Sequence, residues 1–219
     1  SIASGGNYNT VVGDEAGTAL TIGTWNALIG FRAGDALTDS DFNVAIGGQA
    51  LTSDTLGQAS VAIGQNALGT QNFTSATNTY NVAVGYEAGS AVTTGTNNTL
   101  IGGLAGDAIT TGGNSVAVGT AALTSATTAS DNVAVGVSTL QENTTGHSNV
   151  AISNNALLRN TTGTQNVAVG KTALSYNTTA SNNTAVGHAA LLANTTGASN
   201  VALGAYALDA NTTASFNTG

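Results

Sequence analysis

The chain has 219 residues, of which 3 are Lys or Arg and 11 are Asp or Glu, so its formal net charge at neutral pH is −8. Three cations cannot form the basic surface that binds a phosphate backbone, which excludes a nucleic-acid-binding protein. The sequence contains no Cys, which excludes disulfide frameworks and thiolate metal sites, and no apolar run is near the ~18 residues of a membrane span.

A five-residue pattern of the type Asn-Val-Ala-Val-Gly recurs along the whole chain. Successive copies close 17 residues apart, except for one step of 21 residues between Gly64 and Gly85. We therefore predict one repeat domain over residues 1–219, built of twelve 17-residue coils, with a four-residue insertion within 69–80. The closing residues, here called anchors, are Gly13, Gly30, Gly47, Gly64, Gly85, Gly102, Gly119, Gly136, Ser153, Gly170, Gly187 and Gly204.

The repeat is too short for a helical hairpin unit, and a Gly after each pair of β-branched residues disfavours a helix. The pattern instead predicts an all-β fold, a parallel β-solenoid or β-roll, in which each repeat forms one turn. Stacked at about 4.8 Å, twelve coils would form a rod roughly 58 Å long. The pattern continues to both ends and Met is absent, so we expect a fragment of a longer fibre.

Each predicted strand is apolar on both sides. In the third coil, Val44 and Ile46 point to one side of the strand and Ala45 points to the other. The position of Ala45 holds Ala in nine coils and Val or Leu in the other three. Because a single thin coil can cover only one side, we expect the alanine side to be covered by identical chains around an axis. A monomer that leaves this alanine stripe exposed is the alternative.

A large aliphatic side chain stands at one or the other of two positions in the coil. The fourth residue after the anchor is Leu in eight coils and Gly in four. In the four Gly coils, the seventh residue after the anchor is a large aliphatic: Leu20, Leu37, Val92 or Ile109. A close-packed interior of fixed volume demands one such side chain per coil, so both positions are predicted to point inward.

Two polar residues also recur at fixed places in the coil. Asn stands before most strands, as at Asn43 and Asn200, and Thr occupies the eighth position after the anchor from Thr21 to Thr212 in every coil without the insertion. Stacked amides and hydroxyls can form hydrogen bonds along the rod. We therefore assign both columns a structural role.

Aromatic residues mark the candidate binding sites. Tyr8, Trp25 and Phe42 share one column on consecutive coils, and Tyr80 and Phe216 occupy it further along. Polar residues or Ala replace them in other coils, which indicates an exposed position where rings could stack on the sugars of a cell-surface receptor. Packing against a neighbouring chain is the alternative. Phe73 lies in the inserted segment and is a further candidate, because loops on a rigid scaffold often carry function.

Catalytic and cofactor sites are not indicated. His147 and His188 occupy different columns, the acids are isolated, and the Gly-rich segments have no lysine at phosphate-loop spacing. We therefore expect neither an enzyme nor a bound cofactor or metal ion.

Paired threonines raise the alternative of an ice-binding solenoid. Eight adjacent coils, from Thr93-Thr94 to Thr212-Thr213, have two threonine columns. Neighbouring residues of a strand point to opposite sides, so only one column of each pair would face water.

Segments such as Ser115-Val-Ala-Val-Gly119 and Asn200-Val-Ala-Leu-Gly204 resemble the head repeat of trimeric autotransporter adhesins, the YadA-like head, and related repeats of bacteriophage tail fibres. The resemblance covers essentially the whole chain and implies a left-handed β-roll in a homotrimer, located on a bacterial surface or a virion, that attaches to a cell-surface receptor. The coil departs from the adhesin repeat by its longer Asn-Thr-Thr-Gly turn, as at 143–146, which favours the tail-fibre setting.

Overall fold

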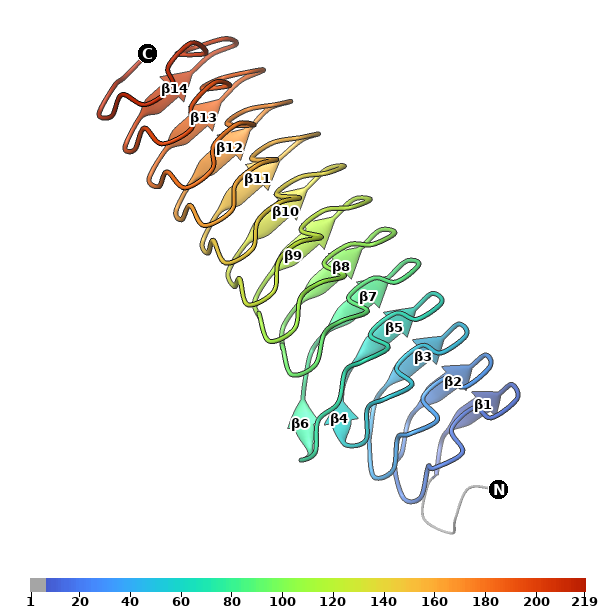
Figure 1. Ribbon diagram of the computed structural model, residues 1–219. Coiled ribbons are helices and arrows are strands. Elements are labelled where there is room, and N and C mark those ends of the chain that lie inside the picture. The colour runs from blue at the N-terminus through green and yellow to red at the C-terminus, as the bar shows by residue number, and fades with distance from the viewer. Residues whose placement is uncertain (1–6) are drawn as a thin grey trace.

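A computed structural model describes residues 7–219, and in this range the chain is all-β without a helix (Figure 1). Coils of the chain stack into a rod, and each coil contributes one three-residue strand to a parallel sheet of twelve strands. The predicted parallel β-solenoid is confirmed, with about eleven turns. The sheet contains β1 (Thr10–Val12), β2 (Ala27–Ile29), β3 (Val44–Ile46), β5 (Val61–Ile63), β7 (Val82–Val84), β8 (Thr99–Ile101), β9 (Val116–Val118), β10 (Val133–Val135), β11 (Val150–Ile152), β12 (Val167–Val169), β13 (Thr184–Val186) and β14 (Val201–Leu203).

The register of the sheet follows the repeat. Residues 17 apart are partners, as in the pairing of Val116 with Val133. At the longer step, Val61 pairs with Val82, so the extra four residues leave the sheet between β5 and β7. Two further short strands, β4 (Gly57–Gln58) before β5 and β6 (Thr77–Asn78) before β7, form a small parallel pair at the opposite side of the rod (Figure 1).

The alanine side of each strand is the interior of the coil. Ala45, Ala117 and Ala134 are fully buried within the single chain, whereas the flanking Val44 and Ile46 are only half-buried. The expectation that sister chains cover an outward alanine stripe is therefore wrong. In the coils with Leu at the fourth position, that side chain already fills most of the interior, so only a small side chain fits opposite it.

The prediction that the fourth and the seventh positions both point into the interior is confirmed, and a third position shares this space. Leu140 and Leu157 are fully buried, as are Leu37 and Ile109 in coils with Gly at the fourth position. A Cβ atom added at Gly34 would lie 2.8 Å from both Leu28 Cδ2 and Leu37 Cδ1. The alanine position, the fourth and the seventh thus share one interior volume, and Leu28 is tolerated on the strand because Gly34 makes room for it.

Buried amides connect the coils, as the recurrent Asn predicted. Asn149 Nδ2 donates to the carbonyl of Gly163 at 2.9 Å, and Asn149 Oδ1 accepts from the backbone N–H of Asn166 at 3.0 Å. Both partners belong to the next coil, so one fully buried side chain joins two coils at two points. The Thr hydroxyls act similarly at the surface, since Thr144 Oγ1 donates to the carbonyl of Thr161 at 3.0 Å.

Each coil closes through several residues with positive φ. The anchor Gly119 has φ +137°, and a Cβ atom there would lie 2.5 Å from the carbonyl oxygen of Gly136. Non-glycine residues also adopt this region, including Leu140 at +51° and Trp25 at +59°. Since the left-handed region costs an L-residue about 1–2 kcal/mol, the stacked coils must supply enough packing to offset it.

Candidate functional site

The outward side of the twelve-stranded sheet forms a continuous apolar stripe, here called the apolar face. Two side chains per strand point outward, and none of them is charged. Most are half-buried, and Val12 and Leu203 on the two outermost strands are 57 % and 72 % exposed. The face consists of Thr10, Val12, Ala27, Ile29, Val44, Ile46, Val61, Ile63, Val82, Val84, Thr99, Ile101, Val116, Val118, Val133, Val135, Val150, Ile152, Val167, Val169, Thr184, Val186, Val201 and Leu203.

The apolar face is as large as the largest apolar patch of a typical monomeric protein. Twelve strands at about 4.8 Å and two columns of side chains cover an area on the order of 500 Å². Monomeric soluble proteins have a largest apolar patch of about 300–600 Å², and such patches are commonly functional. The apolar face is therefore the strongest candidate for an interaction surface in the described part of the chain.

The aromatic column flanks this face on the side where the chain enters each strand. Trp25, Phe42 and Tyr80 are each more than half exposed, as the sequence predicted, and Tyr8 is 71 % exposed. The rings of Tyr8 and Trp25 stack on each other with centroids 4.4 Å apart and an angle of 14° between their planes. Each of these two rings covers one face of the other, so that face of Trp25 is not free to stack on a sugar.

Phe73 lies elsewhere and is buried, with 8 % of its surface exposed. Its backbone N–H donates to Asp54 Oδ1 at 2.9 Å, which holds the inserted segment against the coil before it. The structure therefore does not offer the Phe73 ring to a receptor. The periodicity could not reveal this, because an insertion has no equivalent position in the other coils.

The two threonine columns differ in exposure. Thr144, Thr161 and Thr178 at the eighth position are half-buried, and the hydroxyls of this column donate to carbonyls of the following coil. Thr145 and Thr162 at the ninth position are exposed. One column per pair thus faces water fully, in line with the alternation expected from the sequence.

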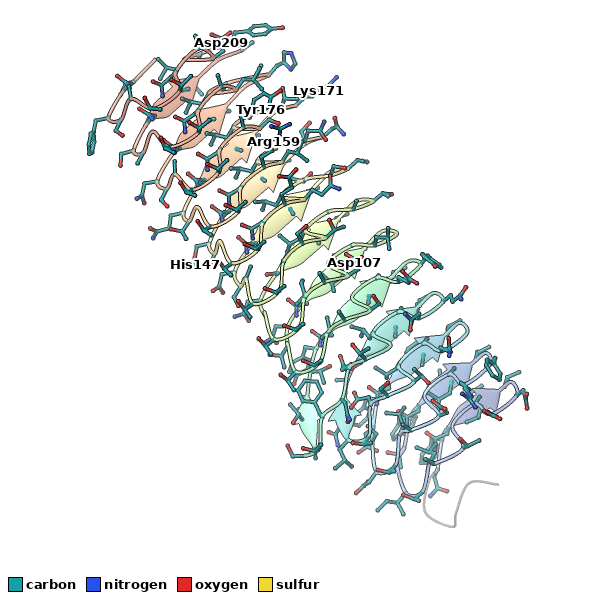
Figure 2. All side chains as sticks on the ribbon, in the orientation of Figure 1. Asp107, His147, Arg159, Lys171, Tyr176 and Asp209 are labelled. Atoms are coloured by element: carbon teal, nitrogen blue, oxygen red, sulfur yellow. The ribbon has the colours of Figure 1, made fainter. Side chains whose placement is uncertain are left out.

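Charged side chains are scattered along the rod. Arg32 pairs with Glu15 on the preceding coil, and the Arg159 guanidinium lies 4.7 Å from the ring centroid of Tyr176 on the next coil. In Figure 2, the labels of Arg159 and Tyr176 lie next to each other over the rod, Lys171 lies at its right edge and His147 at its left edge. Within residues 7–219, no group of three or more His, Asp and Glu side chains is placed to hold a metal ion.

Asp54 is a buried carboxylate in the coil before the insertion. Its oxygens accept hydrogen bonds from Gln71 Nε2 at 2.6 Å, from the N–H of Phe73 and from the N–H of Gly57 at 3.0 Å. Burial raises the pKa of Asp54 above its ordinary value of 3.8, although these donors oppose the shift. The pKa of the half-buried Asp107 is also raised, mainly by burial. The folded state is therefore more stable when the Asp54 and Asp107 carboxyls are protonated than when they are ionised.

The free energy of unfolding should decrease as the pH rises from about 4 towards neutrality. Above its ordinary pKa the Asp54 carboxyl loses its proton readily in the unfolded chain but retains it longer in the folded chain, so ionisation favours unfolding. Asp54→Asn places at this position the residue that five other coils have there, as at Asn143. In urea titrations between pH 4 and 7, the variant should show a flatter pH dependence, and equal slopes would contradict the assignment.

Among the residues described, no helix is long and apolar enough to cross a membrane. The chain was compared with protein-family models, with curated proteins and with solved structures, and none of these comparisons found a match.

Proposed function

We propose that the chain is a rigid segment of an extracellular or virion-borne fibre, assembled as a homotrimer, which presents surfaces for attachment to a cell. The observation that carries the proposal is the apolar face, which runs over all twelve strands without a charged side chain. An identical parallel chain has an apolar face of the same length and covers this one from end to end. The number of chains and the left-handed coiling are taken from the resemblance to YadA-like heads.

The narrowness of the apolar face suits a threefold axis. Each strand has three residues and offers one outward side chain on either side of the buried alanine, as Val133 and Val135 do around Ala134. Around an axis, the column of Val133 can pack on one neighbour and the column of Val135 on the other. Such a head-to-tail ring leaves no apolar column exposed, and the resemblance gives its number of chains as three.

The interior is suited to a mechanical role. The sheet binds each described coil to the next, and buried amides and threonine hydroxyls join most of them as well, so stability accumulates along the rod. This arrangement holds binding surfaces at a fixed distance from the point where a fibre is attached. It also accounts for the small number of charged residues, because most side chains serve contacts between coils.

The mass of the chain in solution tests the proposal. Light scattering after size-exclusion chromatography should give three times the chain mass of 21.2 kDa. The single tryptophan, Trp25, lies beside the apolar face, so its fluorescence should shift when the trimer is diluted to monomers. A monomer at micromolar concentration would contradict the trimer, whereas a dimer would retain the face and contradict the threefold axis.

Receptor binding is assigned to the exposed aromatic column of Tyr8, Trp25, Phe42 and Tyr80. Trp25→Ala should weaken attachment to cells or glycans and leave the melting temperature nearly unchanged, because the Trp25 ring is more than half exposed and the stacked pair contributes about 0.5–1.5 kcal/mol. Glycan-array binding and calorimetry measure the two effects. Tyr206→Ala, which removes a similarly exposed ring outside the column, is the control, and equal binding by both variants would remove the assignment.

Ice binding is the alternative function, for which the exposed ninth-position threonines are the candidate surface. They form one row of hydroxyls about 4.8 Å apart along the rod, while the eighth-position hydroxyls donate to carbonyls. A single row orders a line of water and not a lattice plane. We therefore expect no thermal hysteresis, and a measurable one would favour the alternative.

A further inference from the structure

Several buried asparagines of the C-terminal coils stand in sequences that glycosyltransferases also recognise. The chain contains eight copies of Asn-x-Thr, the acceptor sequence for N-linked glycosylation. Five of them share the seventh position after the anchor, and we call these five residues the asparagine ladder. The ladder is Asn143, Asn160, Asn177, Asn194 and Asn211, and the other three acceptor residues are Asn72, Asn97 and Asn182.

The acceptor nitrogens of the ladder are enclosed and occupied. The first four residues of the ladder are fully buried. Asn160 Nδ2 donates to Asn143 Oδ1 at 2.8 Å and to the carbonyl of Gly163 at 3.0 Å, so both of its N–H groups are used. Asn177 Nδ2 repeats this geometry, with distances of 2.9 and 3.0 Å to Asn160 Oδ1 and the carbonyl of Ala180.

The other three acceptor residues are exposed. Asn97 and Asn182 occupy the surface column that also contains Trp25, and Asn72 lies in the coil with the insertion. Asn97 Nδ2 contacts only the hydroxyl of Thr96, at 3.3 Å. A substituent on these nitrogens can extend into water without moving the coil.

Glycosylation replaces one hydrogen of the amide nitrogen. The bond between Nδ2 and C1 of the sugar forms, the bond between C1 and the diphosphate oxygen of the activated donor breaks, and the amide proton passes to a base of the transferase. The product retains one N–H and has a sugar where the second hydrogen was. At Asn160 this sugar would take the place of Asn143 Oδ1 or of the Gly163 carbonyl, so the coil could not close.

We infer that N-linked glycosylation and folding exclude each other at the asparagine ladder and are compatible at Asn72, Asn97 and Asn182. A folded chain accepts sugar from a diphosphate-activated donor only at the three exposed residues. An unfolded chain that meets a transferase is modified at the ladder and loses its C-terminal coils. The fold therefore requires synthesis in a compartment without N-glycosylation, whether or not the chain serves in a fibre.

The first test uses the folded chain purified from a bacterial host. It is incubated with a soluble N-glycosyltransferase and a nucleoside-diphosphate hexose, and peptide mass spectrometry locates the added hexoses. We expect sugar on Asn72, Asn97 or Asn182 and none on the first four ladder residues. Efficient modification of Asn160 or Asn177 in protein that retains its circular dichroism spectrum would overturn the inference.

The second test compares two variants secreted through a glycosylating pathway. Thr145, Thr162, Thr179, Thr196 and Thr213 are exposed third residues of the ladder acceptor sequences. Changing all five to Ala removes these acceptor sequences, and changing all five to Ser retains them, while both variants keep every ladder Asn. From a bacterial host both variants should fold alike, which separates glycosylation from any effect of the threonines on stability.

We expect the Ala variant to be secreted with the spectrum of the bacterial protein. The wild type and the Ser variant should be modified at the ladder and recovered unfolded or retained in the cell. Secretion of folded wild type with an unmodified ladder would overturn the requirement for a compartment without N-glycosylation, because folding would then precede any competition. Equal failure of the Ala variant would also overturn it, because glycosylation of the ladder would not be the cause.

Discussion

Leu140→Ala should lower the free energy of unfolding by about 2–5 kcal/mol, because the side chain is fully buried and fills the interior of its coil. The adjacent coils repeat the same packing through Leu123 and Leu157, so the cavity cannot close by a shift of one neighbour. Urea denaturation followed by circular dichroism measures the loss. Val137→Ala, which removes a half-exposed aliphatic side chain from the same coil, is the control. It should change the free energy of unfolding by less than about 0.5 kcal/mol.

A compensating pair tests whether volume is the cause. The coil that contains Ala83 has Gly89 at the fourth position and Val92 at the seventh. Leu123→Gly with Ala126→Val reproduces this arrangement without removing a buried amide, since Ala126 is the fully buried seventh residue of its coil, and should be more stable than Leu123→Gly alone. Removal of the positive-φ strain at Leu123 favours both variants equally, so it does not contribute to the difference. A double variant no more stable than the single one would contradict the shared interior volume.

Val118→Asp combined with Val135→Asp should convert the proposed trimer into folded monomers. Both side chains belong to the apolar face on neighbouring strands β9 and β10. In the proposed trimer each substitution would bury one carboxylate in each of the three apolar contacts, at a cost of several kcal/mol per charge. Since each 1.4 kcal/mol changes an equilibrium constant tenfold, association should weaken by at least about a thousandfold. Light scattering gives the mass.

The matched control places the same charges on another side of the same coils. Thr128→Asp with Thr145→Asp changes exposed ninth-position residues and should leave the mass unchanged. Circular dichroism of the Val118 and Val135 variant should retain the β spectrum, because both side chains point away from the interior. An unchanged mass in the face variant would mean that the chains do not associate through the apolar face.

The period of the sequence was sufficient to predict the fold. A solenoid requires the same side chain at the same place in every coil, so the spacing of 17 residues gave the register of the sheet directly. The exchange between the fourth and seventh positions identified the interior, because volume must be conserved from coil to coil. The asparagine and threonine columns likewise predicted hydrogen bonds along the rod.

The side of the strand that faces inward was predicted incorrectly. With apolar residues on both sides, alternation alone does not distinguish inside from outside. A signal was present, because Val11, Leu28 and Leu100 replace Ala only in coils that have Gly at the fourth position. This covariation between two positions places the alanine side in the same interior volume.

Two features of the candidate sites were beyond a periodic pattern. Phe73 lies in the insertion, where no other coil indicates which side chains point inward. The aromatic column was correctly predicted to be exposed, but the positive φ of Trp25 and the stacking of its ring on Tyr8 depend on how the turns of adjacent coils meet. The alignment of the repeats predicts which residues are neighbours, but it does not predict the orientation of their rings.

The amide side chains that precede the strands have a consequence for the order of assembly. Asn149 offers its Oδ1 and Nδ2 to the backbone of the following coil, and Asn166 and Asn183 do the same. Each completed coil thus exposes a template for the next segment to leave the ribosome. We therefore expect the rod to grow coil by coil from its N-terminal end, in the direction of translation, and an incomplete rod to keep a free template for the next coil.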